Sequence, residues 1–211
     1  MIATQRRYTR TFPYIKEFID RGLLGDIVLI RGQYIFFISR ELGWRGSSEK
    51  AGGGALLDPG YHIVDLFYWY KGMPKSVYCR LGKVVGVSVE HETEDVALVM
   101  LEYQDGCVGY IVVNWLSSPP EERVIVHGTK GCAMVSWREL SLSKPDGSVI
   151  VSEKREGELW HEALFNQLNH FVECVRYDKV PLSSARENLN VMRIIDACYR
   201  SVSLGERVLL S

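Results

Sequence analysis

Residues 96–115, VALVMLEYQDGCVGYIVVNW, contain two apolar runs joined by the turn sequence Gln104-Asp105-Gly106. An Asp-Gly turn between such runs is typical of a β-hairpin, and a hairpin pairs its strands antiparallel. The second run, residues 107–115, is apolar at both alternate sets of positions, whereas a strand with one solvated face alternates apolar and polar side chains. We therefore expect an antiparallel sheet with both faces covered, one by helices and the other by a partner subunit.

Further strand-like runs lie on both sides of this hairpin. The turn Pro145-Asp146-Gly147 predicts a second hairpin, and residues 26–38 are rich in β-branched and aromatic side chains that favour a long strand. The later runs that we expect to form strands are residues 76–79, 96–103, 107–115, 123–126, 132–137 and 149–152.

Helical patterns precede and follow the strands. Residues 11–22 begin with the capping residue Thr11 and with Pro13, which a first turn tolerates. A second helix is expected within residues 52–70, after a polar loop at residues 39–51. Two helices, residues 161–177 and 184–204, close the chain. Their apolar residues at helical spacing are Leu164, Leu168, Phe171, Val172 and Val175, then Leu189, Met192, Ile195 and Cys198.

This order of elements decides the fold class. A helix, a strand and a helix are followed by many strands and then by helices, which is not the alternation of a doubly wound fold. We predict an α+β fold, a mostly antiparallel open sheet with helices packed on one face. Residues 1–211 are expected to form a single substrate-binding domain.

Composition excludes several classes of protein. The 211 residues are 46% hydrophobic and 24% charged, which is an ordinary globular mix. Lys and Arg number 25 against 26 Asp and Glu, so no basic excess indicates a nucleic acid or membrane partner. The N-terminus has no apolar segment after Arg6-Arg7 and does not resemble a signal peptide, so we expect a cytoplasmic protein.

The five cysteines are odd in number, and none has the C-x-x-C spacing of a metal or redox motif. We interpret them as buried free thiols in a reducing compartment. The sequence has no cluster of zinc-ligand residues, so we predict no zinc site. The acidic residues 90–95 around His91 are interpreted as a solvated turn rather than as a metal site.

The stretch that indicates chemistry is residues 52–66, GGGALLDPGYHIVDL. Asp58 and His62 are four residues apart, so they are neighbours on one helix face. A carboxylate beside an imidazole can orient the ring and favour its protonated form, and such a pair suits moving a proton near neutral pH. Alternatively, Asp58 only caps the helix and His62 is a satisfied half-buried histidine. The three glycines allow the close approach of a backbone or a ligand, but lack the spacing of a dinucleotide loop.

This stretch resembles the GGGxLxDxGxHxxDL signature of the glucose-fructose oxidoreductase / inositol dehydrogenase / MocA family. The similarity covers almost the whole chain in the family's order. The flanking passages that resemble the family are residues 6–8 with 22–27, 43–45, 127–131 and 197–205.

The resemblance implies an oxidoreductase that uses NAD or NADP and acts on a sugar, a polyol or a related hydroxy compound. It implies that His62 transfers a proton and that Asp58 contacts the substrate and helps to set the histidine. Asp65 matches the last aspartate of the signature, and we interpret it as a structural hydrogen-bonding residue. The open sheet implies a homo-oligomer formed through its face.

Four further residues are candidate substrate contacts. Trp44 and Arg45 lie in the loop ahead of the glycines, Tyr61 is next to His62, and Arg7 belongs to the N-terminal basic pair. The alternative is a solvated loop and ordinary surface charges.

The chain also departs from the family pattern. No glycine fingerprint follows a strand near the N-terminus, and the family's Glu-Lys-Pro lysine has no counterpart, because Glu49-Lys50 precedes Ala51. We therefore expect this chain to be a part of an oxidoreductase, without the nucleotide-binding domain. By itself it is expected to bind no cofactor and to be inactive, and a separate nucleotide-binding domain is its expected partner. The alternative is a non-catalytic binding or dimerisation module derived from that family.

Overall fold

The computed structural model describes residues 1–38, 41–84, 91–157 and 159–210. Its strands form a nine-stranded sheet in the order β8-β7-β6-β5-β1-β4-β3-β2-β9. The strands are β1 (Ile27–Phe37), β2 (Ser76–Gly82), β3 (Val96–Glu102), β4 (Val108–Asn114), β5 (Leu116–Gly128), β6 (Cys132–Ser136), β7 (Glu139–Ser143), β8 (Val149–Lys154) and β9 (Val208–Leu209). The helices are η1 (Gln5–Tyr8), α1 (Phe12–Asp20), η2 (Gly43–Gly46), α2 (Ser48–Ala51), α3 (Pro59–Lys71), α4 (Leu159–Arg176) and α5 (Ala185–Leu204).

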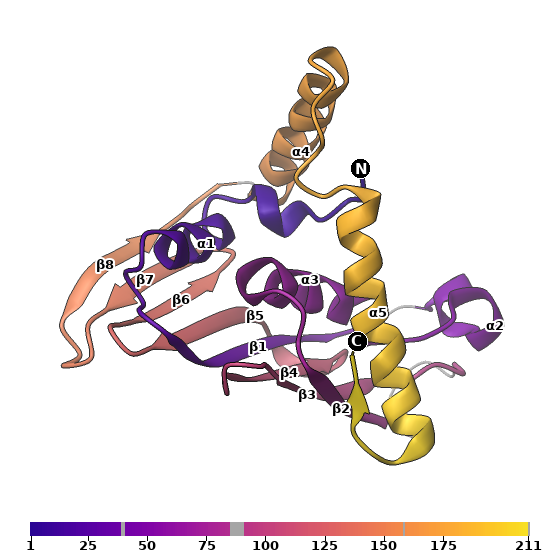
Figure 1. Ribbon diagram of the computed structural model, residues 1–211. Helices are drawn as coiled ribbons and strands as arrows, with labels where there is room; N and C mark the ends of the chain where they lie inside the picture. The colour runs from indigo at the N-terminus through magenta and orange to yellow at the C-terminus, as the bar shows by residue number, and fades with distance from the viewer. Residues whose placement is uncertain (39–40, 85–90, 158, 211) are drawn as a thin grey trace.

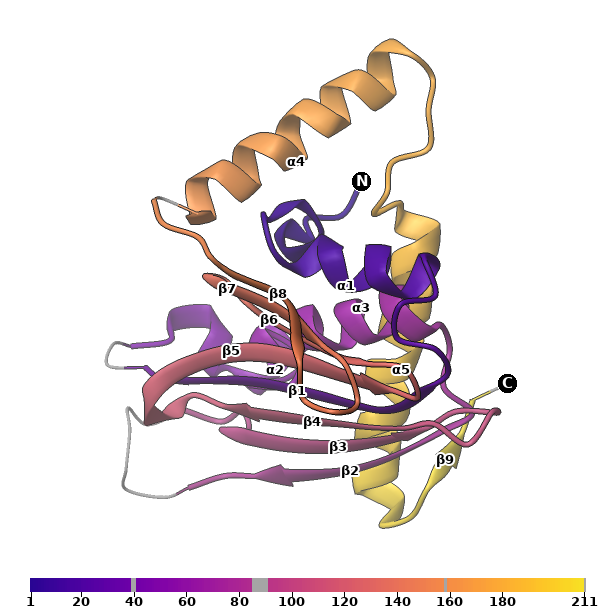
Figure 2. The ribbon, with the colours of Figure 1, turned by 90° about the vertical axis from the view of Figure 1, so that its left-hand side faces the viewer.

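Strand β1 lies in the middle of this sheet, between β5 and β4 (Figure 2). It runs parallel to β4 and antiparallel to β5. The other described pairings are antiparallel. The α+β class and the mostly antiparallel sheet are therefore confirmed, whereas the parallel β1–β4 pair has no counterpart in the sequence-based prediction.

Both predicted hairpins form where their turn sequences lie. Gly106 has a φ of 86° between β3 and β4, and Gly147 has a φ of 83° between β7 and β8. This left-handed backbone region suits glycine, which lacks the Cβ that makes it costly for other residues.

Helices α1, α3 and α5 cover one face of the sheet (Figures 1 and 2). Ile63, Leu66 and Phe67 of α3 are fully buried, and α3 packs against β1, β4 and α5. Helix α5 packs against β2 through a face that includes the buried Ile194 and Cys198. Removal of these apolar side chains from water is the main stabilising contribution to this layer.

The other face of the sheet is open within the described chain. Leu98, Met100 and Tyr110 expose 53%, 47% and 39% of their surface there. Helices therefore cover one of the two apolar faces of β4. That a partner subunit covers the other face stays a prediction.

Helix α4 was expected to pack on the sheet, and it does not. It stands away from the sheet in Figures 1 and 2 and makes its main contacts with η1. Leu168, Val172 and Val175 from its predicted apolar face expose 58%, 56% and 68% of their surface. The residues that α4 buries are instead Leu159, Ala163, Gln167 and Cys174.

Smaller differences concern segments without a strong pattern. The predicted loop at residues 39–51 contains η2 and α2, and its residues 39 and 40 lie outside the described residues. Strands β7 and β9 were not predicted, and β5 extends well beyond the predicted residues 123–126. The five cysteines carry no disulfide; four are buried and Cys132 is half-buried. Within the described ranges, no helix has both the length and the apolar character that crossing a membrane requires.

Candidate functional site

A hollow of about 430 Å³ opens where the first turn of α3 meets β1 and η1. We call it the His62 hollow. His62 and Asp58 reach it from α3 and its N-cap, Arg45 from η2 and Arg6 from η1. Aromatic walls complete it: Tyr34 and Phe36 from β1, Trp137 after β6, and Trp160 from α4.

The glycine run before α3 fixes the course of the chain into this hollow. A Cβ on Gly54 would lie 2.2 Å from the backbone oxygen of Glu94, and one on Gly53 would lie 2.0 Å from the Tyr199 hydroxyl. Only glycine fits such close approaches. The Glu94 carboxylate accepts hydrogen bonds from the backbone N–H groups of Gly54 (2.7 Å) and Leu56 (3.0 Å). The glycines therefore bring two segments of this chain together.

Glu94 is a residue whose role the sequence reasoning missed. Besides the two backbone groups, its carboxylate accepts a hydrogen bond from the Tyr199 hydroxyl at 2.9 Å, which ties the glycine loop to α5. Glu94 belongs to the acidic residues 90–95, which were interpreted as a solvated turn; residue 90 lies outside the described residues. The spacing between Glu94 and the glycines matches no known pattern, so the sequence does not indicate that they lie together.

Asp58 and His62 lie one turn apart but are not joined by a hydrogen bond among the described residues. Asp58 occupies the N-cap of α3, yet its side chain caps no backbone N–H. Its carboxylate Oδ2 lies instead 3.3 Å from Nε of Arg45, in an ion pair about half exposed. The predicted carboxylate–imidazole pair is therefore replaced by a carboxylate–guanidinium pair.

His62 is half-buried at the His62 hollow, and its buried Nδ1 has no hydrogen-bond partner among the described residues. Burial, together with the positive charge of Arg6, holds the pKa of the His62 imidazole well below its usual value of 6.5. The expectation of a favoured protonated form is thus reversed, because no paired carboxylate offsets desolvation. His62 is a neutral imidazole near pH 7 and can accept a proton.

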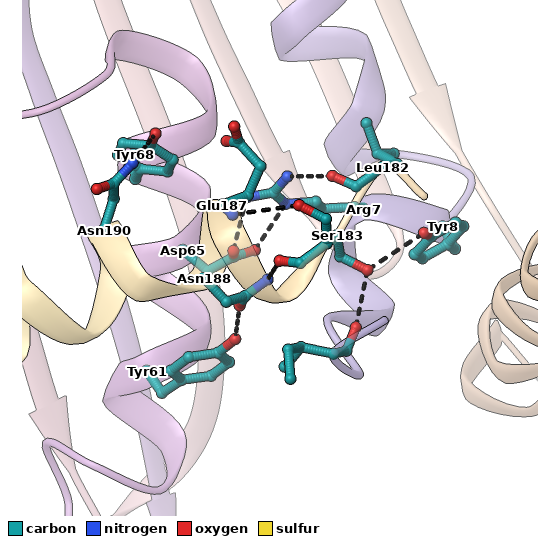
Figure 3. A network of polar contacts seen from close by, with 12 residues as sticks. Arg7, Tyr8, Tyr61, Asp65, Tyr68, Leu182, Ser183, Glu187, Asn188 and Asn190 are labelled. Carbon is teal, nitrogen blue, oxygen red and sulfur yellow. Dashed lines mark hydrogen bonds and ion pairs between the residues drawn. The ribbon is translucent and has the colours of Figure 1, made fainter. Parts of the chain in front are cut away.

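Arg7 lies outside the His62 hollow. Figure 3 shows its guanidinium between Asp65 of α3 and the backbone of Leu182. The two hydrogen bonds to the Asp65 carboxylate are 2.9 and 2.7 Å, the third to the Leu182 carbonyl is 2.9 Å, and both side chains are 1% exposed. Burial raises the pKa of Asp65, and Arg7 opposes that rise. Arg7 is therefore unable to reach a ligand in this hollow.

Arg6, its neighbour, is the arginine that lines the hollow. Its Nε and Nη2 donate to Glu122 on β5 at 2.7 and 2.9 Å, in a buried bidentate pair. Its guanidinium lies 5.3 Å from the ring centroids of both Tyr34 and Trp137. Both Arg6 and Arg7 are visible in the sequence, but the sequence does not indicate which of these two adjacent side chains faces the hollow.

The remaining candidates also divide between two places. The Tyr61 hydroxyl donates to Asn188 of α5 (Figure 3), and Tyr61 does not line the His62 hollow. Burial raises the pKa of Tyr61. Trp44 is 58% exposed and stacks over Arg45 at 4.8 Å. Trp44 lines a smaller neighbouring hollow that also includes Arg45 and Asp58. The structure therefore brings Asp58, His62 and Arg45 together at the His62 hollow, whereas Trp44 contacts Arg45 at the neighbouring one.

Comparison with known proteins gives this geometry a family context. The model of the GFO/IDH/MocA C-terminal domain matches residues 12–134. Scyllo-inositol 2-dehydrogenase (NAD(+)) of Bacillus subtilis is 24% identical in an alignment of 188 positions, gaps included, that covers 86% of this chain and 54% of that protein. D-apiose dehydrogenase of Rhizobium rhizogenes is 22% identical in an alignment of 224 positions, gaps included, that covers 99% of this chain and 63% of that protein.

Solved structures share the fold. Levoglucosan dehydrogenase in complex with NADH and levoglucosan superposes with a TM-score of 0.88 at 20% identity, over 99% of this chain and 65% of that one. An oxidoreductase from Agrobacterium radiobacter in complex with NAD+, L-tartaric acid and magnesium gives a TM-score of 0.85 at 18% identity, over 99% of this chain and 64% of that one. The chain spans between half and two thirds of the length of these four proteins. Because the family model matches more than half of its residues, the chain belongs to the GFO/IDH/MocA family, in which it matches the C-terminal domain.

Proposed function

We propose that this chain is the substrate-binding and acid–base domain of an NAD(P)-dependent oxidoreductase that acts on a sugar, a polyol or a related hydroxy compound. The observation that carries the proposal is the half-buried imidazole of His62, which lines a hollow of polar and aromatic groups and whose buried Nδ1 has no hydrogen-bond partner among the described residues. A neutral base in such a place suits a substrate whose hydroxyl must lose a proton.

The proposed step at His62 is proton acceptance. When a secondary alcohol becomes a ketone, the carbon loses a hydride and the hydroxyl loses a proton. His62 takes that proton, and the nearby positive charge of Arg6 favours its later release. The half-exposed Asp58–Arg45 pair offers an acceptor and donors to neighbouring hydroxyl groups. Arg7 and Tyr61 have structural roles in this proposal.

The nicotinamide cofactor is assigned to a separate domain. The glycine loop does not fit a phosphate, because its backbone N–H groups at Gly54 and Leu56 are already bound to the Glu94 carboxylate. That negative charge also repels phosphate. When bound, the cofactor supplies the hydride acceptor, and we assign no step through it to residues of this chain.

The exposed stripe of α4 supports a docking site for that nucleotide-binding domain. Phe165, Leu168, Val172 and Val175 follow one another at three- and four-residue spacing and expose 56–68% of their surface. Trp160, at the start of the same helix, lines the His62 hollow. A domain that docks on the stripe would contact the same helix whose first turn lines the His62 hollow.

The open sheet face supports homo-oligomerisation. Leu98 and Met100 of β3 and Val108 and Tyr110 of β4 form an apolar surface next to one another. This surface also favours the second candidate function, a non-catalytic dimerisation module. Such a module keeps the sheet contact and has no use for a neutral His62.

Two measurements test the proposal. Calorimetric titration of the full chain with neutral sugars and polyols is expected to give binding that Arg45→Ala weakens. When the chain is mixed with the nucleotide-binding domain of a family relative, NAD+ and the bound sugar, we expect NADH formation. His62→Ala lowers its rate at least about 100-fold.

The matched control is His127→Gln, a histidine on β5 that does not line the hollow; it leaves the rate unchanged. Sugar binding without NADH formation favours the binding module. Absence of binding by every sugar and polyol overturns the proposal.

A further inference from the structure

A second hollow, of about 570 Å³, adjoins the His62 hollow. We call it the β5 hollow. Strand β6 pairs only with residues 123–127 of β5, so the earlier part of β5 extends beyond it. The chain then turns after β6, where the Ser136 hydroxyl accepts hydrogen bonds from the backbone of Arg138 and Glu139. The hollow lies between this turn and the part of β5 that pairs with β1 but not with β6.

The two hollows share one wall. Tyr34, Phe36 and Trp137 line both of them. The rings offer apolar faces against which the C–H face of a sugar packs, and ligand sites commonly combine such surfaces with a few polar groups. A ligand in one hollow therefore lies beside the other.

The two hollows also share one ion pair. Arg6 lines the His62 hollow, and its partner Glu122 lines the β5 hollow. Two hydrogen bonds of 2.7 and 2.9 Å join them, and the Trp137 indole N–H donates to Glu122 at 2.5 Å. A buried bidentate pair with a third donor holds its geometry well. It forms a rigid base between the two hollows.

The charges of the β5 hollow are balanced at short range. Arg123 lies 3.3 Å from Glu121 and 3.9 Å from Glu139, and the three side chains are 36–38% exposed. Donors and acceptors thus alternate without a large excess of either sign. This arrangement suits hydroxyl groups better than a phosphate or a carboxylate, for which an excess of positive charge is needed.

We propose that the two hollows form one substrate groove, in which the β5 hollow binds a neutral second sugar ring. The substrate is then a glycoside, such as a disaccharide, whose reacting ring lies at His62. The inference rests on the proposed function for the location of the reacting ring, and it adds the size and charge of the substrate.

Calorimetry of the full chain with neutral disaccharides and with their component monosaccharides tests this groove. We expect at least one disaccharide to bind about tenfold more tightly than its monosaccharides, since several hydrogen bonds are added. Arg123→Ala is expected to remove most of that difference. The control Lys144→Ala, an exposed lysine in the β7–β8 turn, preserves it.

Amide and imidazole NMR shifts locate the two rings independently. A monosaccharide is expected to shift His62, and a disaccharide to shift His62 together with Arg123 and Ser136. Equal affinity for both sugars, with no shift at Arg123, overturns the groove but leaves the proposed function intact. If neither sugar binds, both proposals fail. Tighter binding of acidic than of neutral disaccharides contradicts the assigned substrate charge.

Discussion

Helices α4 and α5 are alike in sequence and different in structure. Both have apolar residues at helical spacing, and both lie near the end of the chain. Helix α5 buries Val191, Ile194 and Cys198 against the body of the protein, whereas α4 leaves Leu168 and Val172 more than half exposed. Amphipathic spacing therefore indicates that a face will be covered, but not by which partner.

The start of α5 is also held by polar contacts. Arg7 binds Asp65 and the Leu182 carbonyl, the Ser183 hydroxyl donates to the backbone of Ile2, and Asn188 accepts from Tyr61 (Figure 3). These contacts connect η1, α3 and the beginning of α5. Helix α4 joins this network through two side chains: His170 accepts a hydrogen bond from the backbone N–H of Leu182, and Asn166 donates to the backbone carbonyl of Tyr8.

The largest effect is expected from Asp65→Asn, which leaves the Arg7 guanidinium buried without its counter-charge. Breaking one side of a buried pair costs about 3–5 kcal/mol. Urea unfolding measures the loss. Glu17→Gln, which breaks the exposed Glu17–Arg21 pair, serves as the control and costs below about 0.5 kcal/mol. Equal small effects of the two changes would contradict the importance of this network.

A direct comparison of the helices comes from matched truncations. Ile194→Ala in α5 opens a cavity in the core and is expected to lower the free energy of unfolding by about 3 kcal/mol. Leu168→Ala in α4 removes an exposed side chain and changes it by less than about 0.5 kcal/mol. Denaturant midpoints of the two variants give the result. A similar loss for both would mean that α4 packs against the rest of the chain in solution.

The stripe on α4 should matter only when its partner is present. We expect Leu168→Glu with Val172→Glu to leave the free energy of unfolding nearly unchanged and to weaken binding of a relative's nucleotide-binding domain at least tenfold, or about 1.4 kcal/mol. The charge-matched control is Lys16→Glu, at a partly exposed lysine on α1. Undiminished binding by the α4 double variant would place the docking surface elsewhere.

The smallest expected effect is a pH dependence at α3. Burial and Arg6 lower the pKa of His62, so the unfolded chain binds its proton first as the pH falls. Stability should therefore decrease below about pH 6.5, by at most about 1.4 kcal/mol per pH unit. His62→Gln removes this part of the dependence. A parallel decline in both proteins would show that His62 does not contribute.

The sequence predicts elements best where periodicity and turn chemistry agree. The β3–β4 hairpin has both an Asp-Gly turn and two long apolar runs, and it forms as expected. Strands β7 and β9 are short and lack such a pattern. The parallel pairing of β1 with β4 depends on contacts between residues about 80 positions apart, which local patterns do not specify.

The candidate site is predictable in composition but not in orientation. The glycines, Asp58 and His62 are visible in one stretch of sequence, and Asp58 and His62 line one hollow. The partner of Asp58 is not visible, because Arg45 approaches from a loop whose course depends on tertiary contacts. The sequence analysis also predicts a favoured protonated form of His62, whereas burial lowers the pKa of its imidazole. Burial of a side chain is a property of the whole fold, so a local pattern does not reveal it.

The central place of β1 has a consequence for synthesis of the protein. This strand is made before its two neighbours in the sheet, β4 and β5, which end at residues 114 and 128. Until those residues leave the ribosome, both edges of β1 have no sheet partner, and pairing across so long a chain segment is slow. The nascent chain therefore passes through a stage in which an apolar strand needs protection from aggregation, and chaperone contact is expected to concentrate on residues 27–37.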